Sequence, residues 1–151
     1  MMKKYYLLII LLLFTQCDYK PIYSQNNQNF GIKVIELNEN RSNKILATRL
    51  KNYSYKKNNL FLYELKLLTS EDKLILSKDT SGDPLLLGLK IILKIEVYEE
   101  NKMISKKEYS EQFNYQNLSK KFELNRYEDE IRTNIYNKMI SKILIDLTNL
   151  K

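Results

Sequence analysis

The segment from Leu85 to Tyr98, LLLGLKIILKIEVY, constrains the fold more strongly than any other part of this chain. Every second residue from position 87 to position 97 is a large aliphatic one: Leu87, Leu89, Ile91, Leu93, Ile95 and Val97. The residues between them are mostly small or polar. Because side chains alternate across a strand, this pattern predicts a β-strand with one buried face and one solvated face. A short buried helix is the alternative, and the unbroken period of two favours the strand.

A second alternating segment follows closely and predicts a β-hairpin. Four polar residues, 99–102, separate the first strand from a run that extends from Met103 to Tyr115. This run carries Lys, Glu, Ser and Gln at many positions, which is typical of an edge strand protected against stray pairing. A sheet with one solvated face also needs a cover on its apolar face.

The first half of the chain predicts two further strands with a helix between them. Residues 32–37 and 60–68 have the composition of strands. Ser42 or Asn43 can cap a helix that ends near Tyr53. Two strands joined by a helical crossover run parallel when they share a sheet, so we expect a mixed sheet.

The segment from Lys73 to Lys78 has two interpretations. It either continues the strand of residues 60–68 past a bulge or forms a separate strand, and the sequence leaves both open. A turn follows at residues 80–84, TSGDP, because Gly82 permits a positive φ and Pro84 restricts the residue before it.

A long amphipathic helix is predicted from Lys121 to Asn149. Its apolar residues recur at spacings of three and four and form one stripe: Leu124, Tyr127, Ile131, Ile135, Met139, Ile143, Leu147 and Leu150. We expect this stripe to cover the sheet, with Ile135 and Ile143 buried; a coiled coil or a helix on a membrane surface is the alternative. The acidic run 128–130 is expected to be solvated or to complement the helix dipole.

Together these elements predict an α+β fold: a four-stranded mixed β-sheet with two α-helices packed on one face. The domain is expected to span residues 31–151, and a polar, aperiodic linker precedes it in residues 17–30. A chain of this length suits one such domain with a core of its own.

Residue types that catalysis and metal binding commonly use are scarce. The chain has no His, which removes the commonest general base and metal ligand. Cys17 is its only Cys, so an internal disulfide and a thiolate metal cage are excluded. None of the three glycines lies in a phosphate-binding loop. We therefore expect a protein that is not an enzyme, with no catalytic residues, no metal site and no cofactor.

The net charge of +7 specifies no partner by itself. The basic residues are 21 Lys and only 4 Arg, and the Lys are dispersed along the chain rather than gathered in a block. A basic nucleic-acid-binding domain is one alternative function, but it would need clustered Arg and aromatic side chains on one surface. We therefore expect no nucleic-acid partner.

The first 16 residues have the pattern of an export signal. Lys3 and Lys4 precede an apolar run from Tyr5 to Phe14, which at about 15 Å of helix is too short to span a bilayer. Cys17 follows three residues later, where a lipoprotein signal peptidase acts. We predict a lipoprotein signal peptide in residues 1–16 and lipid attachment at Cys17, with acyl chains that anchor the protein to a membrane. An ordinary signal peptide with an incidental Cys, or an uncleaved anchor, is the alternative.

The residues after Cys17, Asp18-Tyr19-Lys20-Pro21-Ile22-Tyr23, resemble the mature start of the LptE family of lipopolysaccharide-assembly lipoproteins, in its alphaproteobacterial form. The order of predicted elements is similar, and so is the segment Phe113-Asn114-Tyr115. Phe14 and Gln16 depart from the family's usual signal-peptidase motif.

This resemblance implies an outer-membrane lipoprotein at the periplasmic face. It would plug an LptD-like β-barrel, help to assemble that barrel, and take part in the transport of lipopolysaccharide to the cell surface. Asp18 leaves retention in the inner membrane open, since an Asp after the lipidated Cys has that effect in some bacteria. The alternative is a lipid-anchored periplasmic binding or structural module with another partner.

Three lysines form the candidate contact for the phosphates of lipopolysaccharide. If strands two to four form a meander, Lys78 lies at the same end of the sheet as Lys120 and Lys121. The C-terminal helix starts there too, and the unpaired N–H groups of a helix start favour anions. A separate strand at 73–78 would break this arrangement.

Overall fold

The computed structural model describes residues 29–37, 43–54, 56 and 59–150. Its elements follow in the order β1 (Phe30–Leu37), α2 (Asn43–Lys51), β2 (Phe61–Lys78), β3 (Pro84–Glu99), β4 (Lys102–Gln116) and α3 (Lys121–Thr148). The predicted α+β fold is confirmed. Cys17 and the predicted signal peptide lie outside the described residues. Phe30, placed in the linker by the sequence, is instead the first residue of β1 and is buried against Tyr63.

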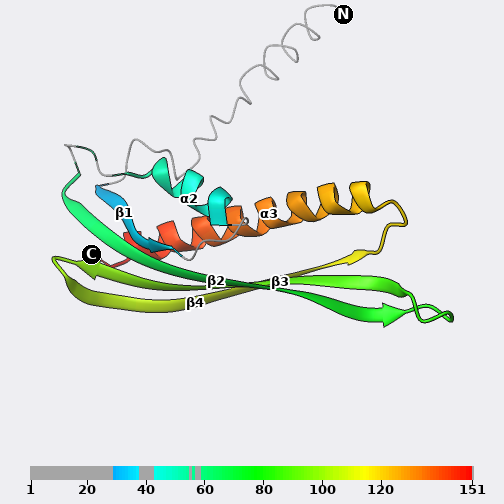
Figure 1. Ribbon diagram of the computed structural model, residues 1–151. Helices are drawn as coiled ribbons and strands as arrows, with labels where there is room; N and C mark the ends of the chain where they lie inside the picture. Colours follow the sequence, from blue (N-terminus) through cyan, green and yellow to red (C-terminus); the bar gives the residue numbers. More distant parts are fainter. Residues whose placement is uncertain (1–28, 38–42, 55, 57–58, 151) are drawn as a thin grey trace, which may run out of the picture.

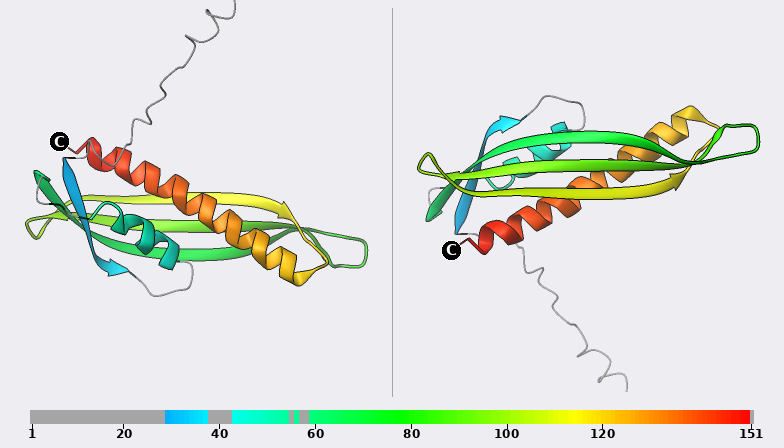
Figure 2. Two further views of the ribbon diagram at one scale, coloured as in Figure 1. Left: turned by 90° about the horizontal axis from the view of Figure 1, so that it is seen from above. Right: turned by 90° about the horizontal axis from the view of Figure 1, so that it is seen from below.

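The four strands form one mixed sheet in the order β1-β2-β3-β4. β1 runs parallel to β2, as the helical crossover predicted, and β2, β3 and β4 form an antiparallel meander. Both helices lie on the same face of the sheet (Figures 1 and 2). We call the end with the β2–β3 turn and the start of α3 the distal end, and the opposite end the proximal end.

β3 is the central strand of the core, as its sequence pattern predicted. The six aliphatic residues at odd positions from 87 to 97 are all buried: Leu87, Leu89, Ile91, Leu93, Ile95 and Val97. β4 is an edge strand, and of its side chains on the helix-covered face only Tyr109 and Tyr115 are buried. Its tight turn to β3 places Glu100 and Asn101 at positive φ, which matches the right-handed twist of a hairpin.

The structure resolves the open question about residues 73–78. β2 is one strand of 18 residues, paired with β3 from Glu64 opposite Tyr98 to Lys78 opposite Pro84. The pairing shifts only near its end, between Ile75 and Lys78. The sequence was ambiguous because four polar residues, 69–72, interrupt its apolar pattern, although each of them pairs with β3.

α3 is the main cover of the sheet, and the predicted burial of Ile135 and Ile143 is confirmed. The predicted stripe is wrong at Tyr127, which is 38% exposed, whereas Glu128 beside it is only 4% exposed. α3 crosses the sheet diagonally, from the side of β2 at the distal end to the side of β4 at the proximal end (Figure 2). Because of this crossing, the first turns of α3 face polar residues of β2 instead of aliphatic ones of β3.

α2 lies beside α3 on the covered face, above β1 and β2 (Figure 2). Leu46 and Leu50 of α2 are buried. Asn43 is buried at the first position of this helix, and its side-chain oxygen accepts hydrogen bonds from the Thr69 and Tyr136 hydroxyls. In the part of the chain that the structure describes, no helix is both long enough and apolar enough to cross a membrane.

Candidate functional site at the distal end of the sheet

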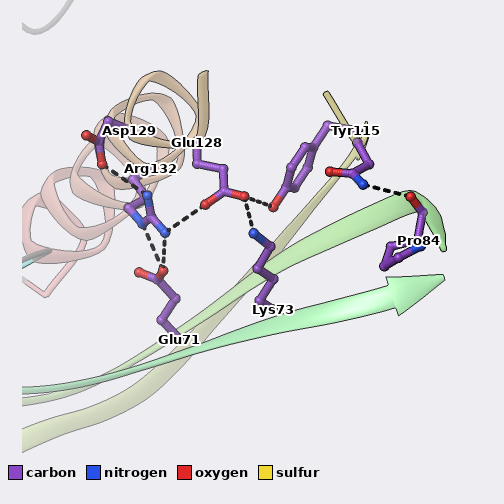
Figure 3. A network of polar contacts seen from close by, with 8 residues as sticks. Glu71, Lys73, Pro84, Tyr115, Glu128, Asp129 and Arg132 are labelled. Carbon is purple, nitrogen blue, oxygen red and sulfur yellow. Dashed lines mark hydrogen bonds and ion pairs between the residues drawn. The ribbon is translucent and has the colours of Figure 1, made fainter. Parts of the chain in front are cut away.

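The distal end brings together the three lysines that the sequence singled out. The backbone N–H of Asn117 donates to the Leu85 carbonyl at 2.9 Å, and its side-chain amide donates to the Pro84 carbonyl at 2.8 Å. These bonds tie the exit of β4 to the start of β3, and the one to the Pro84 carbonyl is drawn in Figure 3. Lys78, at the end of β2, pairs with Pro84 at the start of β3. Lys120 and Lys121 follow β4 at the start of α3. The meander therefore places the three residues at one end.

All three lysine side chains are exposed, and acids share the region with them. Lys120 precedes α3 as its N-cap residue without a side-chain capping bond, and its ammonium lies 3.0 Å from the Glu123 carboxylate. The Asp79 carboxylate accepts the backbone N–H groups of Ser81 and Asp83 at 2.9 Å each, which stabilises the β2–β3 turn. Exposed ammonium groups beside a helix start can bind phosphate oxygens.

Apolar side chains are exposed at the same end, and the sequence reasoning missed them. The exposed set comprises Ile75, Leu85, Leu118 and Phe122, and Phe122 is 80% exposed. Each belongs to a strand end, a turn or the first turn of a helix, outside the periodic stripes. One clue to this apolar surface was available in the sequence, because Phe122 directly follows Lys120 and Lys121. The distal end thus offers cations and apolar side chains together, a combination suited to an amphipathic anion.

A polar network around the buried Glu128 fixes the start of α3 to the sheet behind these residues (Figure 3). The Glu128 carboxylate accepts the Tyr115 hydroxyl at 2.7 Å and lies 2.5 Å from the Lys73 ammonium. Arg132 Nη2 lies 3.5 Å from the second oxygen of Glu128. The network joins β2, β4 and α3 through one carboxylate.

Arg132 extends the network to β2 and along α3. Its Nε and Nη2 atoms lie 2.8 Å and 2.7 Å from one Glu71 oxygen, and its Nη1 lies 3.0 Å from the Asp129 carboxylate. The expectation that the acidic run 128–130 is solvated is therefore wrong for Glu128. Its neighbours Asp129 and Glu130 are exposed as expected. The reason is the diagonal crossing of α3, which turns Glu128 toward Lys73 and Tyr115.

The electrostatics of the network favour the ionised carboxylate. Burial alone would raise the pKa of Glu128, but the hydrogen bonds from Lys73 and Tyr115 and the nearby charge of Arg132 outweigh it and hold that pKa below its ordinary value. Burial and the bond to Glu128 raise the pKa of Tyr115, so its hydroxyl stays protonated and donates. We infer a structural role for this network.

Neither metal ligands nor a cofactor cradle can be assigned among the described residues. Within residues 29–37, 43–54, 56 and 59–150, no group of three or more Cys, Asp or Glu side chains is arranged to hold a metal ion. The most enclosed carboxylate of the distal end, Glu128, already has Lys73 and Arg132 as counter-ions. The predicted lipid attachment at Cys17 stays a prediction.

Comparison with known proteins gives structural neighbours only. No known protein family matches the sequence, and no curated protein does. Rare lipoprotein B from Shewanella oneidensis has a similar structure, with a TM-score of 0.58 at 14% identity over 80% of this chain and 97% of that one. A minor lipoprotein from Acinetobacter baumannii matches with a TM-score of 0.53 at 12% identity, over 78% of this chain and 92% of that one. Lipoprotein B from Nitrosomonas europaea matches with a TM-score of 0.51 at 12% identity, over 76% and 80%.

This chain shares their fold. At such identities the likeness concerns the path of the backbone, and it extends over nearly the whole length of the first two neighbours. Fold alone does not assign function, because one fold can carry unrelated sites.

Proposed function

We propose that this chain is an outer-membrane lipoprotein of the LptE type, anchored through Cys17 at the periplasmic face. It plugs an LptD-like β-barrel, helps that barrel to assemble, and takes part in lipopolysaccharide transport to the cell surface. In this role it binds and positions rather than catalyses, and it needs no cofactor. Because of Asp18, the membrane that holds the protein needs to be tested, since retention in the inner membrane would separate the protein from such a barrel.

The observation that carries the proposal is the shared fold of the described domain and several lipoproteins, joined to a chain start that resembles the LptE family. The fold likeness supports a small α+β domain held at a membrane by its N-terminus. The segment from Asp18 to Tyr23 after the single Cys adds the link to lipopolysaccharide assembly. A lipid-anchored periplasmic module with another partner is the second candidate.

The distal end is the proposed contact for lipopolysaccharide. Lys78, Lys120 and Lys121 offer ammonium groups to the phosphates of the lipid A head group. Leu85 and Phe122 offer exposed apolar surface to its acyl chains. The network around Glu128 holds the start of α3 in place beneath them.

Identification of the membrane partner tests the proposed function most directly. The full chain, carrying an affinity tag after Lys151, is purified from detergent-solubilised membranes of its own cells, and the major co-purifying protein is identified by mass spectrometry. We expect a large outer-membrane β-barrel in a stoichiometric amount. Another major partner would favour the alternative module, and recovery from inner-membrane fractions would contradict the proposed location.

The anchor has a separate test. Intact-mass measurement of the membrane-derived protein should show loss of residues 1–16 and the added mass of acyl chains on Cys17. A chain that keeps residues 1–16, or that carries an unmodified Cys17 thiol, would contradict lipidation.

Charge reversal tests the lipopolysaccharide contact. Lys78, Lys120 and Lys121 are replaced together by Glu, and binding of purified lipopolysaccharide is measured. The charge-matched control replaces Lys44, Lys51 and Lys56, which are exposed on and after α2, away from the distal end. We expect the distal variant to lose at least about tenfold in affinity and the control to lose much less. Equal losses of affinity in the two variants would mean that positive charge attracts lipopolysaccharide non-specifically and that the distal end is not a binding site.

A further inference from the structure

Two adjoining hollows lie between β4 and α3 on the helix-covered face of the sheet. Phe113 of β4 pairs there with Leu89, which is fully buried, yet Phe113 itself is 45% exposed. Tyr127 of α3 is partly exposed as well. Both aromatic residues line both hollows, which have cavity volumes of 240 Å³ and 480 Å³. We call these two hollows the β4–α3 groove.

The aromatic rings of the groove are held in place from behind. Tyr127 lies edge-on to Tyr115, with 6.1 Å between the ring centroids and an angle of 77° between the ring planes. Tyr115 is buried, and its hydroxyl donates to the Glu128 carboxylate at 2.7 Å. A ligand that stacks on Tyr127 therefore meets a platform that is already ordered, which lowers the entropic cost of binding.

Polar side chains surround these rings. The polar residues that line the smaller hollow are Glu111, Gln112, Glu130, Asn134 and Lys138. Amides both donate and accept hydrogen bonds and carboxylates accept them, so this lining can bond to hydroxyl groups. A purely apolar ligand, such as an acyl chain, would take these groups out of water without offering them a partner.

The charges of the lining have partners of opposite sign within the protein. The Glu111 carboxylate lies 2.8 Å from the Lys138 ammonium and 2.6 Å from the Lys142 ammonium. The Glu130 carboxylate lies 3.5 Å from Arg126. The groove therefore favours a ligand without net charge, unlike the three lysines of the distal end.

We propose that the β4–α3 groove binds an uncharged stretch of a saccharide chain. A pyranose ring presents C–H groups on its faces and hydroxyl groups around its rim. This combination matches an aromatic platform surrounded by amides and carboxylates. One sugar ring stacks on Tyr127 beside Phe113, and its hydroxyl groups bond to Asn134 and to the carboxylates next to it.

This inference goes beyond the proposed function and does not rest on it, because the groove uses none of Lys78, Lys120 and Lys121. At the location proposed above, two sources supply pyranose rings: the sugar part of lipopolysaccharide and the glycan strands of the cell wall. The chemistry that the groove recognises is common to both, so the experiment uses one probe for each source.

Saturation-transfer NMR on the full chain tests the groove. The protein is kept in lauryldimethylamine oxide, a detergent without a sugar headgroup that could compete. The probes are chitotetraose, which represents the cell-wall glycan, and the lipid-free core oligosaccharide of lipopolysaccharide, each titrated separately. We expect a saturable signal on the ring C–H protons of at least one probe, and the probe that binds more tightly identifies the source.

Two variants, each with a matched control, locate the binding. Tyr127→Leu keeps an apolar side chain but removes the flat ring, and its control is Tyr98→Leu, a half-buried ring on the uncovered face of the sheet. Asn134→Ala removes one amide, and its control is Asn125→Ala, an exposed residue of α3 outside the groove lining. We expect Tyr127→Leu to lower the affinity about tenfold and Asn134→Ala about threefold, with both controls near the wild type.

The rival occupant is an acyl chain, for which decanoate is the probe. Absence of a saturable signal from both saccharides would overturn the inference, and binding of decanoate in their place would assign the groove to an acyl chain. Saccharide binding that neither Tyr127→Leu nor Asn134→Ala weakens would lie outside the groove and would overturn it too. Equal thermal unfolding midpoints of each variant and its control exclude misfolding, and Tyr127→Phe, which keeps the ring, should bind like the wild type. None of these results depends on capture of a β-barrel, so a failure here is distinct from a failure of the proposed function.

Discussion

The two halves of α3 hold the sheet by different means. From Ile135 to Leu147 the helix buries aliphatic and Met side chains against the core, and several of them are almost fully enclosed. From Leu124 to Arg132 it buries Leu124 and Ile131 but also encloses Glu128, which with Arg132 makes ion pairs and hydrogen bonds to β2 and β4. The proximal half is therefore held mainly by apolar burial, whereas in the distal half a polar network shares that task.

The two halves of α3 therefore differ in how much they stabilise the fold and in how much apolar surface lies exposed beside them. Apolar burial is non-directional and scales with the area removed from water, so the proximal half supplies the larger stabilising contribution. A buried ion network depends on geometry and gives a smaller net contribution, but it fixes one orientation. Phe122 and Leu85 are exposed at this distal end.

The largest expected effect is a cavity in the proximal half. Ile143 is 1% exposed, and Ile143→Ala should lower the free energy of unfolding by about 2–5 kcal/mol through lost burial and a residual cavity. Chemical denaturation of the chain from Ser24 onward measures it. Ile145→Ala is the matched control, since Ile145 is 37% exposed on the same helix. A loss under about 1 kcal/mol at Ile143 would mean that α3 is not the main cover.

A smaller loss is expected in the distal half. Glu128→Ala leaves the Tyr115 hydroxyl and Arg132 without their shared acceptor and should lower the free energy of unfolding by about 1.5–3 kcal/mol. Glu130→Ala is the control: Glu130 faces Arg126 at 3.5 Å in an exposed pair, which contributes at most about 1 kcal/mol. If both variants lost the same free energy of unfolding, the network around Glu128 would contribute no more to stability than an exposed ion pair.

The same carboxylate should make the distal half sensitive to pH. The folded-state pKa of Glu128 lies below its ordinary value of 4.5, so its stabilisation is complete above pH 4.5 and is lost as the pH falls through the lowered pKa. Glu128→Gln removes this contribution. We expect the difference in unfolding free energy between wild type and Glu128→Gln to be largest near neutral pH and to shrink in acid. A difference that is constant down to pH 3 would contradict this.

The smallest effect on stability is expected at the exposed distal surface. Phe122→Ser should change the free energy of unfolding by less than about 0.5 kcal/mol, because its ring is 80% exposed. If the distal end contacts lipopolysaccharide, the same variant should nevertheless weaken lipopolysaccharide binding. Leu60→Ser, an exposed residue next to the start of β2, is the control for both measurements. Equal binding by the two variants would exclude Phe122 from the contact.

Local sequence patterns predicted most elements because one face of each is buried. The alternation in β3 and the stripe from Ile131 to Leu147 each report contact with a single core, and both were confirmed. The pattern failed where polar residues interrupt an element or are buried within it. Residues 69–72 obscured the continuity of β2, and Glu128 carried no local signal of burial. Its partners Lys73 and Tyr115 lie far away in the sequence.

The lysines at the distal end were brought together as the meander predicted, yet the exposed apolar side chains beside them were not foreseen. Phe122 and Leu85 look like ordinary core residues to a hydrophobicity pattern, because such a pattern records residue type and spacing but not the limits of the sheet. Where the strands end, the same residue type has nothing to pack against.

The sequence by itself determined the α+β class, the parallel crossover between β1 and β2, the buried face of β3 and the apolar stripe of α3 from Ile131 to Leu147. Those features depend on periodicity and on short connections, which are local properties of the chain. Only the tertiary structure decided the diagonal path of α3. That path turns Glu128 inward and leaves Phe113 of β4 partly exposed. A crossing angle arises from how whole faces pack together, and no short stretch of sequence contains that information.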